Sequence, residues 1–244
     1  GITKFSAANL EYIRNVRNYM TFNDCVNLVE LSVPKMKNFI QGEELTAAAL
    51  TSGWAANCTA LSVVEAPIMT IVDTKSFSGC SSLAMLPNYD IKKIGFAAFY
   101  NTAINGVLDL PNLEILGDGA FGKTKITGIE NLGTVQTIGE NDFGSYWDAD
   151  KRVFGECANL TYAKLPSTLT KLGCRTFYNC KALRTVVCYA VAPPECTISS
   201  SKDPFDGCAS FTIYVPDESV ETYKTTTGWQ NHASKIKPLS EYTE

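Results

Sequence analysis

Hydrophobic positions repeat along this chain with a period of 22 residues. In the middle of the sequence an aromatic residue marks the period, at Phe77, Phe99, Phe121 and Phe143. A pair made of an aliphatic residue and a glycine keeps the same interval, at Ile94-Gly95, Leu116-Gly117 and Ile138-Gly139. Self-similarity at a fixed period of about 20–50 residues is typical of solenoid proteins, in which similar units stack on one another.

Within each unit, two short stretches alternate between apolar and polar residues. The first precedes a proline, as in Leu31-Ser32-Val33 before Pro34. This alternation predicts a half-buried β-strand, and the proline ends the strand because it lacks an amide donor. The second stretch leads into the aliphatic–Gly pair, as in residues 113–117, and we expect it on the opposite side of the coil. The Phe-x-x-Cys stretch between the strands is too short for a regular helix and predicts a tight or 3₁₀-like turn.

The whole chain therefore predicts a single β-rich solenoid domain of right-handed stacked coils over residues 1–244. We expect about eight coils, each with two short strands and a tight turn, and short helices in the insertions. Residues 1–18 would form a partial first coil and residues 216–244 a C-terminal cap. In the cap, Asp217 is a candidate helix N-cap, and Val220 and Tyr223 would share one face of a short helix. Trp229 and Ile236 would then close the core.

Composition and charge narrow the range of partners. The chain has 21 Lys and Arg against 25 Asp and Glu, a formal net charge of −4. Nucleic acid is therefore not an expected partner, because phosphate binding needs a basic stripe. No apolar run is long enough to cross a bilayer. The chain begins at Gly1 within repeat-like sequence, so we expect that a signal peptide or lipoprotein anchor has been removed.

Most of the nine cysteines share one place in the repeat, three or four residues after the aromatic residue. They are Cys25, Cys58, Cys80, Cys157, Cys180 and Cys208, and two units have Thr102 and Thr124 there instead. Exchange between small residues indicates buried packing rather than disulfide chemistry. Outside this place, a Cys188–Cys196 disulfide is an alternative in an oxidising compartment.

The combined pattern resembles a known family. Aliphatic-Gly-x-x-x-Phe-x-x-Cys-x-x-Leu-x-x-Leu-x-Leu-Pro is similar to the BspA-like, or Treponema-type, leucine-rich repeat; the units at Phe22 and Phe154 show clearly its part from the phenylalanine to the proline. The stretch 213–224, followed by Gly228-Trp229 and residues 236–239, resembles the ending common in Bacteroides members. The units at Thr102 and Thr124 depart from the pattern because they lack the cysteine.

This resemblance implies a leucine-rich repeat solenoid of a secreted or cell-surface bacterial protein. It implies adhesion or ligand binding as the usual role, with a host or microbial surface protein, a matrix component or a glycan as the partner. The family carries no catalytic residue to transfer to this chain. We therefore expect a non-enzymatic protein without a cofactor.

Interruptions of the period are the best places to look for a specific site, because solenoid insertions gather on one face. They lie at residues 36–53, which include a short helix expected over 43–50, at residues 144–153 and at residues 190–204. The second holds Tyr146, Trp147, Asp148 and Asp150, our candidate ligand-binding residues. Exposed aromatic side chains beside charges suit a protein or sugar contact. The alternative is that Trp147 folds back over the edge of the solenoid and the carboxylates are only solvated.

Catalytic chemistry has little support in the sequence. His232 is the only histidine and lies in the expected cap, so a Cys–His or Ser–His pair would have to use it. A zinc site with several histidines is excluded for the same reason. A hydrolase using dispersed carboxylates such as Glu140 and Asp142 remains an alternative, as does a passive spacer within a larger surface protein.

Overall fold

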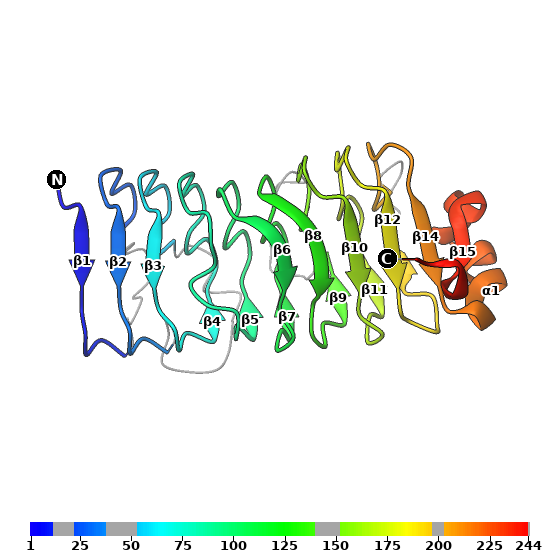
Figure 1. Ribbon diagram of the computed structural model, residues 1–244, viewed down its shortest axis with the longest axis horizontal. Helices are drawn as coiled ribbons and strands as arrows, with labels where there is room; N and C mark the ends of the chain where they lie inside the picture. Colours follow the sequence, from blue (N-terminus) through cyan, green and yellow to red (C-terminus); the bar gives the residue numbers. More distant parts are fainter. Residues whose placement is uncertain (12–21, 38–52, 140–151, 197–202, 244) are drawn as a thin grey trace.

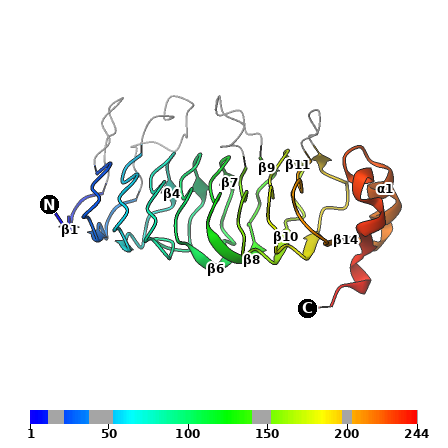
Figure 2. The ribbon, with the colours of Figure 1, turned by 90° about the horizontal axis from the view of Figure 1, so that it is seen from above.

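The chain forms an elongated stack of coils that runs from the N-terminus at one end to a helical cap at the other (Figure 1). The structure is a computed structural model, and it describes residues 1–11, 22–37, 53–139, 152–196 and 203–243. Most coils of the middle of the stack add one short strand to a sheet on one side and, further along the chain, a second strand to a sheet on another side (Figure 2). The solenoid that the repeat period predicts is thereby confirmed.

The first side of the stack carries the first strand of most coils, which in several coils precedes a proline, and all pairings there are parallel. One sheet has three strands, β1 (Lys4–Ser6), β2 (Glu30–Ser32) and β3 (Val63–Glu65). The other has six strands, β6 (Asn105–Asp109), β8 (Lys125–Asn131), β10 (Tyr162–Leu165), β12 (Thr185–Cys188), β14 (Thr212–Val215) and β15 (Ile236–Pro238). Strands β6 and β14 alternate between more buried and more exposed side chains, as a strand with one face on the core requires, whereas β10 and β12 are buried over three consecutive residues.

The second side carries two-residue strands that run into the aliphatic–Gly pairs. One sheet contains β4 (Ile71–Val72), β5 (Lys93–Ile94) and β7 (Ile115–Leu116). The other contains β9 (Thr137–Ile138), β11 (Lys171–Leu172) and β13 (Glu195–Cys196). This side is therefore divided between β7 and β9.

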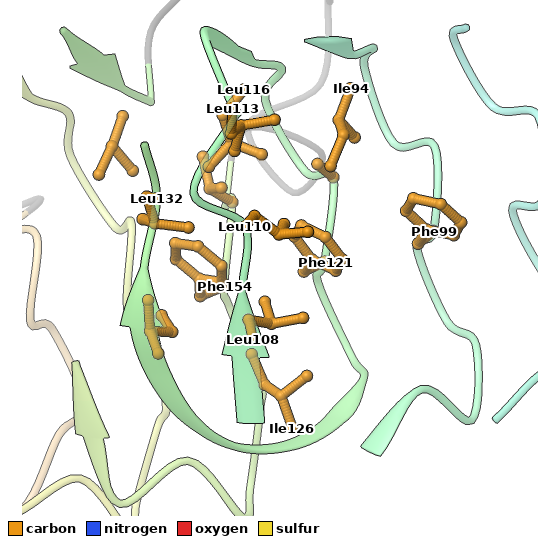
Figure 3. Close-up of a cluster of buried hydrophobic side chains, with 14 of the residues drawn as sticks. Ile94, Phe99, Leu108, Leu110, Leu113, Leu116, Phe121, Ile126, Leu132 and Phe154 are labelled. Carbon is orange, nitrogen blue, oxygen red and sulfur yellow. The ribbon is translucent and has the colours of Figure 1, made fainter. Parts of the chain in front are cut away.

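A column of aromatic rings runs through the core between the two sides. From Phe77 to Phe205, successive rings are stacked with centroids 5.5–6.0 Å apart. The ring that follows Phe121 is Phe154, so the 22-residue beat is interrupted there by an insertion. Phe143, which the beat also selects, lies outside the described residues. Figure 3 shows Phe99, Phe121 and Phe154 with the leucines that surround them.

The cysteine position of the repeat lies beside this column. The thiols of Cys58, Cys157, Cys180 and Cys208 donate to the carbonyl of the aromatic residue one coil earlier, with S···O distances of 2.8–3.2 Å. Thr102 and Thr124 instead donate to the aromatic carbonyl of their own coil. Burial raises the pKa of Cys157 to about 11, which keeps this thiol neutral. All nine cysteines are free, so Cys188 and Cys196 form no disulfide.

The turn around each aromatic residue uses a left-handed backbone at one fixed place. The third residue of the Phe-x-x-Cys turn has a positive φ in successive coils, at Asp24, Gly79, Asn101, Lys123, Glu156, Asn179 and Gly207. Five of these seven residues are Asp, Asn or Gly, the types that adopt this conformation most readily. The expected tight turn is therefore confirmed, with a more specific geometry than the sequence pattern suggested.

The glycines after the second strands allow neighbouring coils to approach closely. A Cβ added at Gly117 would lie 2.5 Å from the carbonyl carbon of Gly95, and one at Gly95 would lie 2.5 Å from the amide nitrogen of Thr74. The Gly95 carbonyl carbon and the Thr74 amide nitrogen are backbone atoms, which cannot move away as the end of a side chain could. The stacking distance therefore dictates glycine here.

One coil lacks its first strand. Residues 83–87 lie between β3 and β6 without joining either sheet, and the gap is visible in Figure 1. The sequence explains this gap, because only four positions separate Leu83 from Pro87, whereas six separate Leu61 from Pro67. The shortened segment leaves too few residues for a paired strand.

The C-terminal cap closes the core as expected. It contains η3 (Asp217–Ser219), α1 (Val220–Thr225), η4 (Trp229–Lys235) and η5 (Leu239–Glu241). Tyr223, Trp229 and Ile236 are buried. The hydroxyl of Tyr223 donates to the Ala190 carbonyl at 2.7 Å, and Trp229 Nε1 donates to the Pro194 carbonyl at 2.8 Å.

The expectation that Asp217 caps the helix is wrong. Neither helix start has a side-chain cap, and the Asp217 carboxylate instead accepts a hydrogen bond from the Ser240 amide at 2.9 Å. The side chain is used to hold the end of the chain against the cap. The short helix is therefore stabilised by the burial of Tyr223 rather than by capping.

We expect Gly117→Ala to lower the free energy of unfolding by about 2 kcal/mol or more, because the new methyl group would collide with the backbone of the preceding coil. Gly106→Ala is a matched control, since Gly106 has open space around its Cβ position and only a positive φ. Gly106→Ala should lower the free energy of unfolding by about 1 kcal/mol. Urea unfolding measures both variants, and equal losses would contradict the steric account.

Candidate functional site

The outward face of the six-stranded sheet carries a groove of about 460 Å³. Strands β8, β10 and β12 form its floor, and the C-terminal tail forms one wall. It is lined by Glu130, Thr161, Tyr162, Lys164, Arg184, Thr185, Tyr242 and Thr243. We call it the tyrosine groove. Its lining combines two phenol rings, both signs of charge and three threonine hydroxyls.

Tyr162 owes its position to a glycine on the neighbouring strand. In the parallel register Tyr162 of β10 pairs with Gly128 of β8. A Cβ on Gly128 would lie 2.3 Å from Cε1 of the Tyr162 ring, so the ring crosses the strand where a side chain is missing. Partial burial, and then the nearby Glu130 carboxylate, raise the pKa of Tyr162. The phenol therefore stays protonated and able to donate a hydrogen bond.

Lys164 and Glu130 form the charged part of the groove. Lys164 Nζ lies 2.7 Å from Glu130 Oε1, and only 10% of the lysine side chain is exposed. A lysine this buried needs a counter-charge, whereas an exposed pair would contribute little to stability. The pair thus fixes a positive and a negative group side by side on an otherwise solvated sheet face.

The C-terminal tail extends the aromatic character of this face. The Tyr242 ring packs on Tyr214 of β14, with centroids 5.2 Å apart. A bridge of 3.1 Å between Lys237 and Glu241 ties the tail to β15. In Figure 2 the C-terminus projects on the same side as β6, β8 and β10. The tail therefore forms a wall of the groove.

The site proposed from sequence lies elsewhere. Tyr146, Trp147, Asp148 and Asp150 fall within residues 140–151, outside the described part of the chain, and so does the helix expected over 43–50. The sequence pattern does not reveal the tyrosine groove, because its residues occupy ordinary outward positions of three different coils. The pairing of Tyr162 with Gly128 is the feature that could have indicated the groove, but it is known only once β8 and β10 are aligned.

The repeat pattern decides the family. The family model described as "BspA type Leucine rich repeat region" matches this chain over residues 20–147 and 148–234, with six copies of the repeat. The chain belongs to the BspA-type leucine-rich repeat family. The resemblance drawn from the Phe-x-x-Cys pattern is confirmed. Proteins of this repeat family are bacterial surface proteins and are generally non-enzymatic.

One solved structure supports this BspA-type solenoid. A leucine-rich repeat protein from Bacteroides ovatus is 16% identical, has a TM-score of 0.57, and is matched over 86% of this chain and 48% of its own. The chain thus spans about half the length of that protein, and the likeness shows the fold. A leucine-rich cell surface protein from Faecalibacterium prausnitzii has 16% identity, a TM-score of 0.34, and matches over 88% of this chain and 76% of its own. No curated protein matches the chain.

The single histidine of this BspA-type chain serves the cap. His232 Nε2 lies 2.9 Å from Asp203 Oδ2, and the His232 ring packs edge-on against Phe205. Burial alone would raise the pKa of Asp203, but hydrogen bonds from His232 and from the Phe205 amide lower it below its usual value. Among the described residues no cluster of His, Cys, Asp or Glu could hold a metal ion. In that same part of the chain no helix is long and apolar enough to span a membrane.

Asp73 is a buried carboxyl group outside the groove. It occupies the place where later BspA-type coils have the glycine of the aliphatic–Gly pair, and it is only 3% exposed. Its Oδ1 accepts the Thr74 amide at 2.7 Å, whereas its Oδ2 has no hydrogen-bond partner. Burial raises the pKa of Asp73 to about 6, partly offset by the Thr74 hydrogen bond. This group destabilises the fold when it is ionised.

The stability of the solenoid should therefore fall as pH rises through the range in which Asp73 ionises. Its pKa is raised from 3.8 to about 6, so the folded state holds this proton over a pH range in which the unfolded chain loses it. The corresponding stabilisation, roughly 3 kcal/mol at most, is complete below about pH 4 and lost by about pH 6. Asp73→Asn should remove this slope and be the more stable form at pH 7. Urea unfolding at pH 4, 5, 6 and 7 measures the effect, and parallel pH profiles would contradict it.

Proposed function

We propose that this chain is a non-enzymatic interaction module of a secreted or surface-anchored bacterial protein. Its partner would be a host or microbial surface protein, a matrix component or a glycan. Membership of a family of bacterial surface proteins supports the location. The extended strand face supports the role, because stacked coils present a long surface that one partner can contact at many places.

The observation that carries the proposal is the tyrosine groove. Tyr162, Tyr242 and the Lys164–Glu130 pair lie on a face that contributes nothing to the aromatic core. Rigid phenol rings give a large contact area at low entropic cost, and they suit both peptides and sugar rings. The partly buried lysine and carboxylate add directed hydrogen bonds that discriminate between partners.

The insertion at residues 144–153 is a second candidate for the contact. Tyr146, Trp147, Asp148 and Asp150 combine aromatic and charged side chains in a polar stretch that the repeat does not require. Exposed tryptophan and tyrosine are frequent anchors of binding surfaces. We keep these residues as a proposal that is independent of the groove.

The elongated shape favours one further role, that of a spacer between a cell and another domain (Figure 1). A spacer needs length and stability but no ligand. It would leave the groove without a partner, and the binding experiments below distinguish the two roles.

We expect Tyr162→Ala to weaken binding to a partner found by screening glycans and matrix proteins by about 10- to 30-fold, or about 1.4–2 kcal/mol. Gly128→Ala should weaken it in the same direction, because the new methyl group displaces the Tyr162 ring without removing it. Tyr189→Ala, which removes an exposed tyrosine four residues beyond Thr185, should have no effect. Surface plasmon resonance measures all three, and unchanged affinity in the first two variants would exclude the groove.

The insertion is tested separately with the double variant Tyr146→Ala/Trp147→Ala in the same screen. If these side chains make the contact, the dissociation constant should rise about tenfold or more, since two aromatic anchors are removed. Asp148→Asn/Asp150→Asn serves as a matched variant that changes only charge. Equal binding by the aromatic double variant would remove this loop from consideration.

A further inference from the structure

Exposed apolar side chains gather in the coils that contain β3 and β6 and in the coil between them. Of the ten large hydrophobic residues that are exposed among the described residues, half lie between residues 63 and 107. They are Val63, Ile68, Met85, Tyr89 and Val107. Single exposed apolar residues are ordinary, but a cluster over successive coils is typical of a binding surface.

Three of these residues form a row that we call the apolar stripe, Val63, Met85 and Val107. They follow one another at 22-residue intervals and are 50%, 68% and 44% exposed. Val63 lies in β3, Val107 lies in β6, and Met85 lies in the coil that has no strand between them. The stripe thus crosses the gap between the two sheets on this face (Figure 1).

Carboxylates border the stripe on one side. Glu65 and Asp109 each lie two residues beyond a stripe residue, and Asp90 follows Tyr89. Segments 59–70, 81–91 and 103–112 contain these three acids and no lysine or arginine. Neighbouring acids are compensated, since Glu30 pairs with Lys4 and Glu130 pairs with Lys164. The surface is therefore apolar along its centre and negative at its margin, which is complementary to a basic amphipathic partner.

The spacing of the stripe selects the conformation of that partner. No strand pairing spans this gap, but the core rings of the same three coils lie 5.7 and 5.6 Å apart, so Val63 and Val107 are separated by about 11 Å along the solenoid axis. Apolar residues on one face of an α-helix recur about every 5.4 Å, so three of them span about 10.8 Å. Side chains on one face of an extended strand span about 13 Å over three positions. A helix lying along the axis therefore matches the stripe more closely than an extended peptide does.

We propose that the apolar stripe is a docking site for a basic amphipathic helix of a partner protein. Its apolar residues at i, i+4 and i+7 would pack on Val63, Met85 and Val107. Lysine or arginine residues beside them would pair with Glu65 and Asp109. This site is distinct from the tyrosine groove, whose residues come from β8, β10, β12 and the C-terminal tail.

The test uses a defined probe, a helix-forming 18-residue peptide with leucines on one face and lysines beside them. Fluorescence anisotropy should show saturable binding in the micromolar range that weakens as salt is raised. A peptide of the same composition in scrambled order should bind at least tenfold more weakly. No saturation at about 1 mM peptide, or equal binding of the scrambled peptide, would overturn the proposal.

Protein variants then locate the contact. Val63→Thr/Met85→Gln/Val107→Thr should raise the dissociation constant at least tenfold, and Glu65→Gln/Asp109→Asn should reduce its salt dependence. Val191→Thr, at an exposed valine outside the stripe, and Tyr242→Ala, in the tyrosine groove, should change it less than twofold. Unaltered binding by the triple variant, or loss of binding in Tyr242→Ala, would contradict the assignment. Circular dichroism confirms that each variant retains the fold.

Discussion

The distance between stacked coils is the constraint on which the rest of the structure depends. Parallel backbone hydrogen bonds fix that distance near 4.8 Å at the strands, and every other element must fit it. The phenylalanine rings stack face to face at 5.5–6.0 Å and fill the space between strands. The glycines of the aliphatic–Gly pairs are present because a methyl group would not fit between coils this close. The cysteine thiols also hold neighbouring coils together, since most thiols in the repeat position donate a hydrogen bond to a carbonyl of the preceding coil.

Much of this arrangement could be predicted from the sequence, because it depends on local and periodic features. The period identified the solenoid, the alternation before Pro34 and Pro166 located β2 and β10, and the small residues of the cysteine position indicated packing. The apolar residues of the C-terminal segment, Tyr223 and Trp229, were correctly placed in the closing core. Each of these predictions depends only on the stacking of a residue on the equivalent residue of the neighbouring coil.

What the sequence did not yield depends on the alignment between coils or on contacts distant in the chain. The tyrosine groove combines residues up to 113 positions apart, from Glu130 to Thr243. Asp217 was expected to cap its own helix, but its carboxylate bonds to the Ser240 amide, a contact made only when the tail folds back. The irregular step from Phe121 to Phe154 shows the same limit, since spacing alone also selected Phe143. Outward residues have no packing partner to constrain their type, so functional positions leave a weaker periodic signal than buried ones.

The two interruptions of the strand ladders fall at different interfaces between coils. On the first side, pairing stops after β3 and resumes at β6, whereas β4, β5 and β7 still connect those coils on the second side. Between β7 and β9 the second side is open, but there the first side has its longest strand, β8, paired along β6. In a one-dimensional stack, cooperativity is limited by the weakest nearest-neighbour coupling. Because the interruptions are staggered, hydrogen-bonded strands join adjacent coils throughout the middle of the solenoid, and its two halves are expected to unfold together.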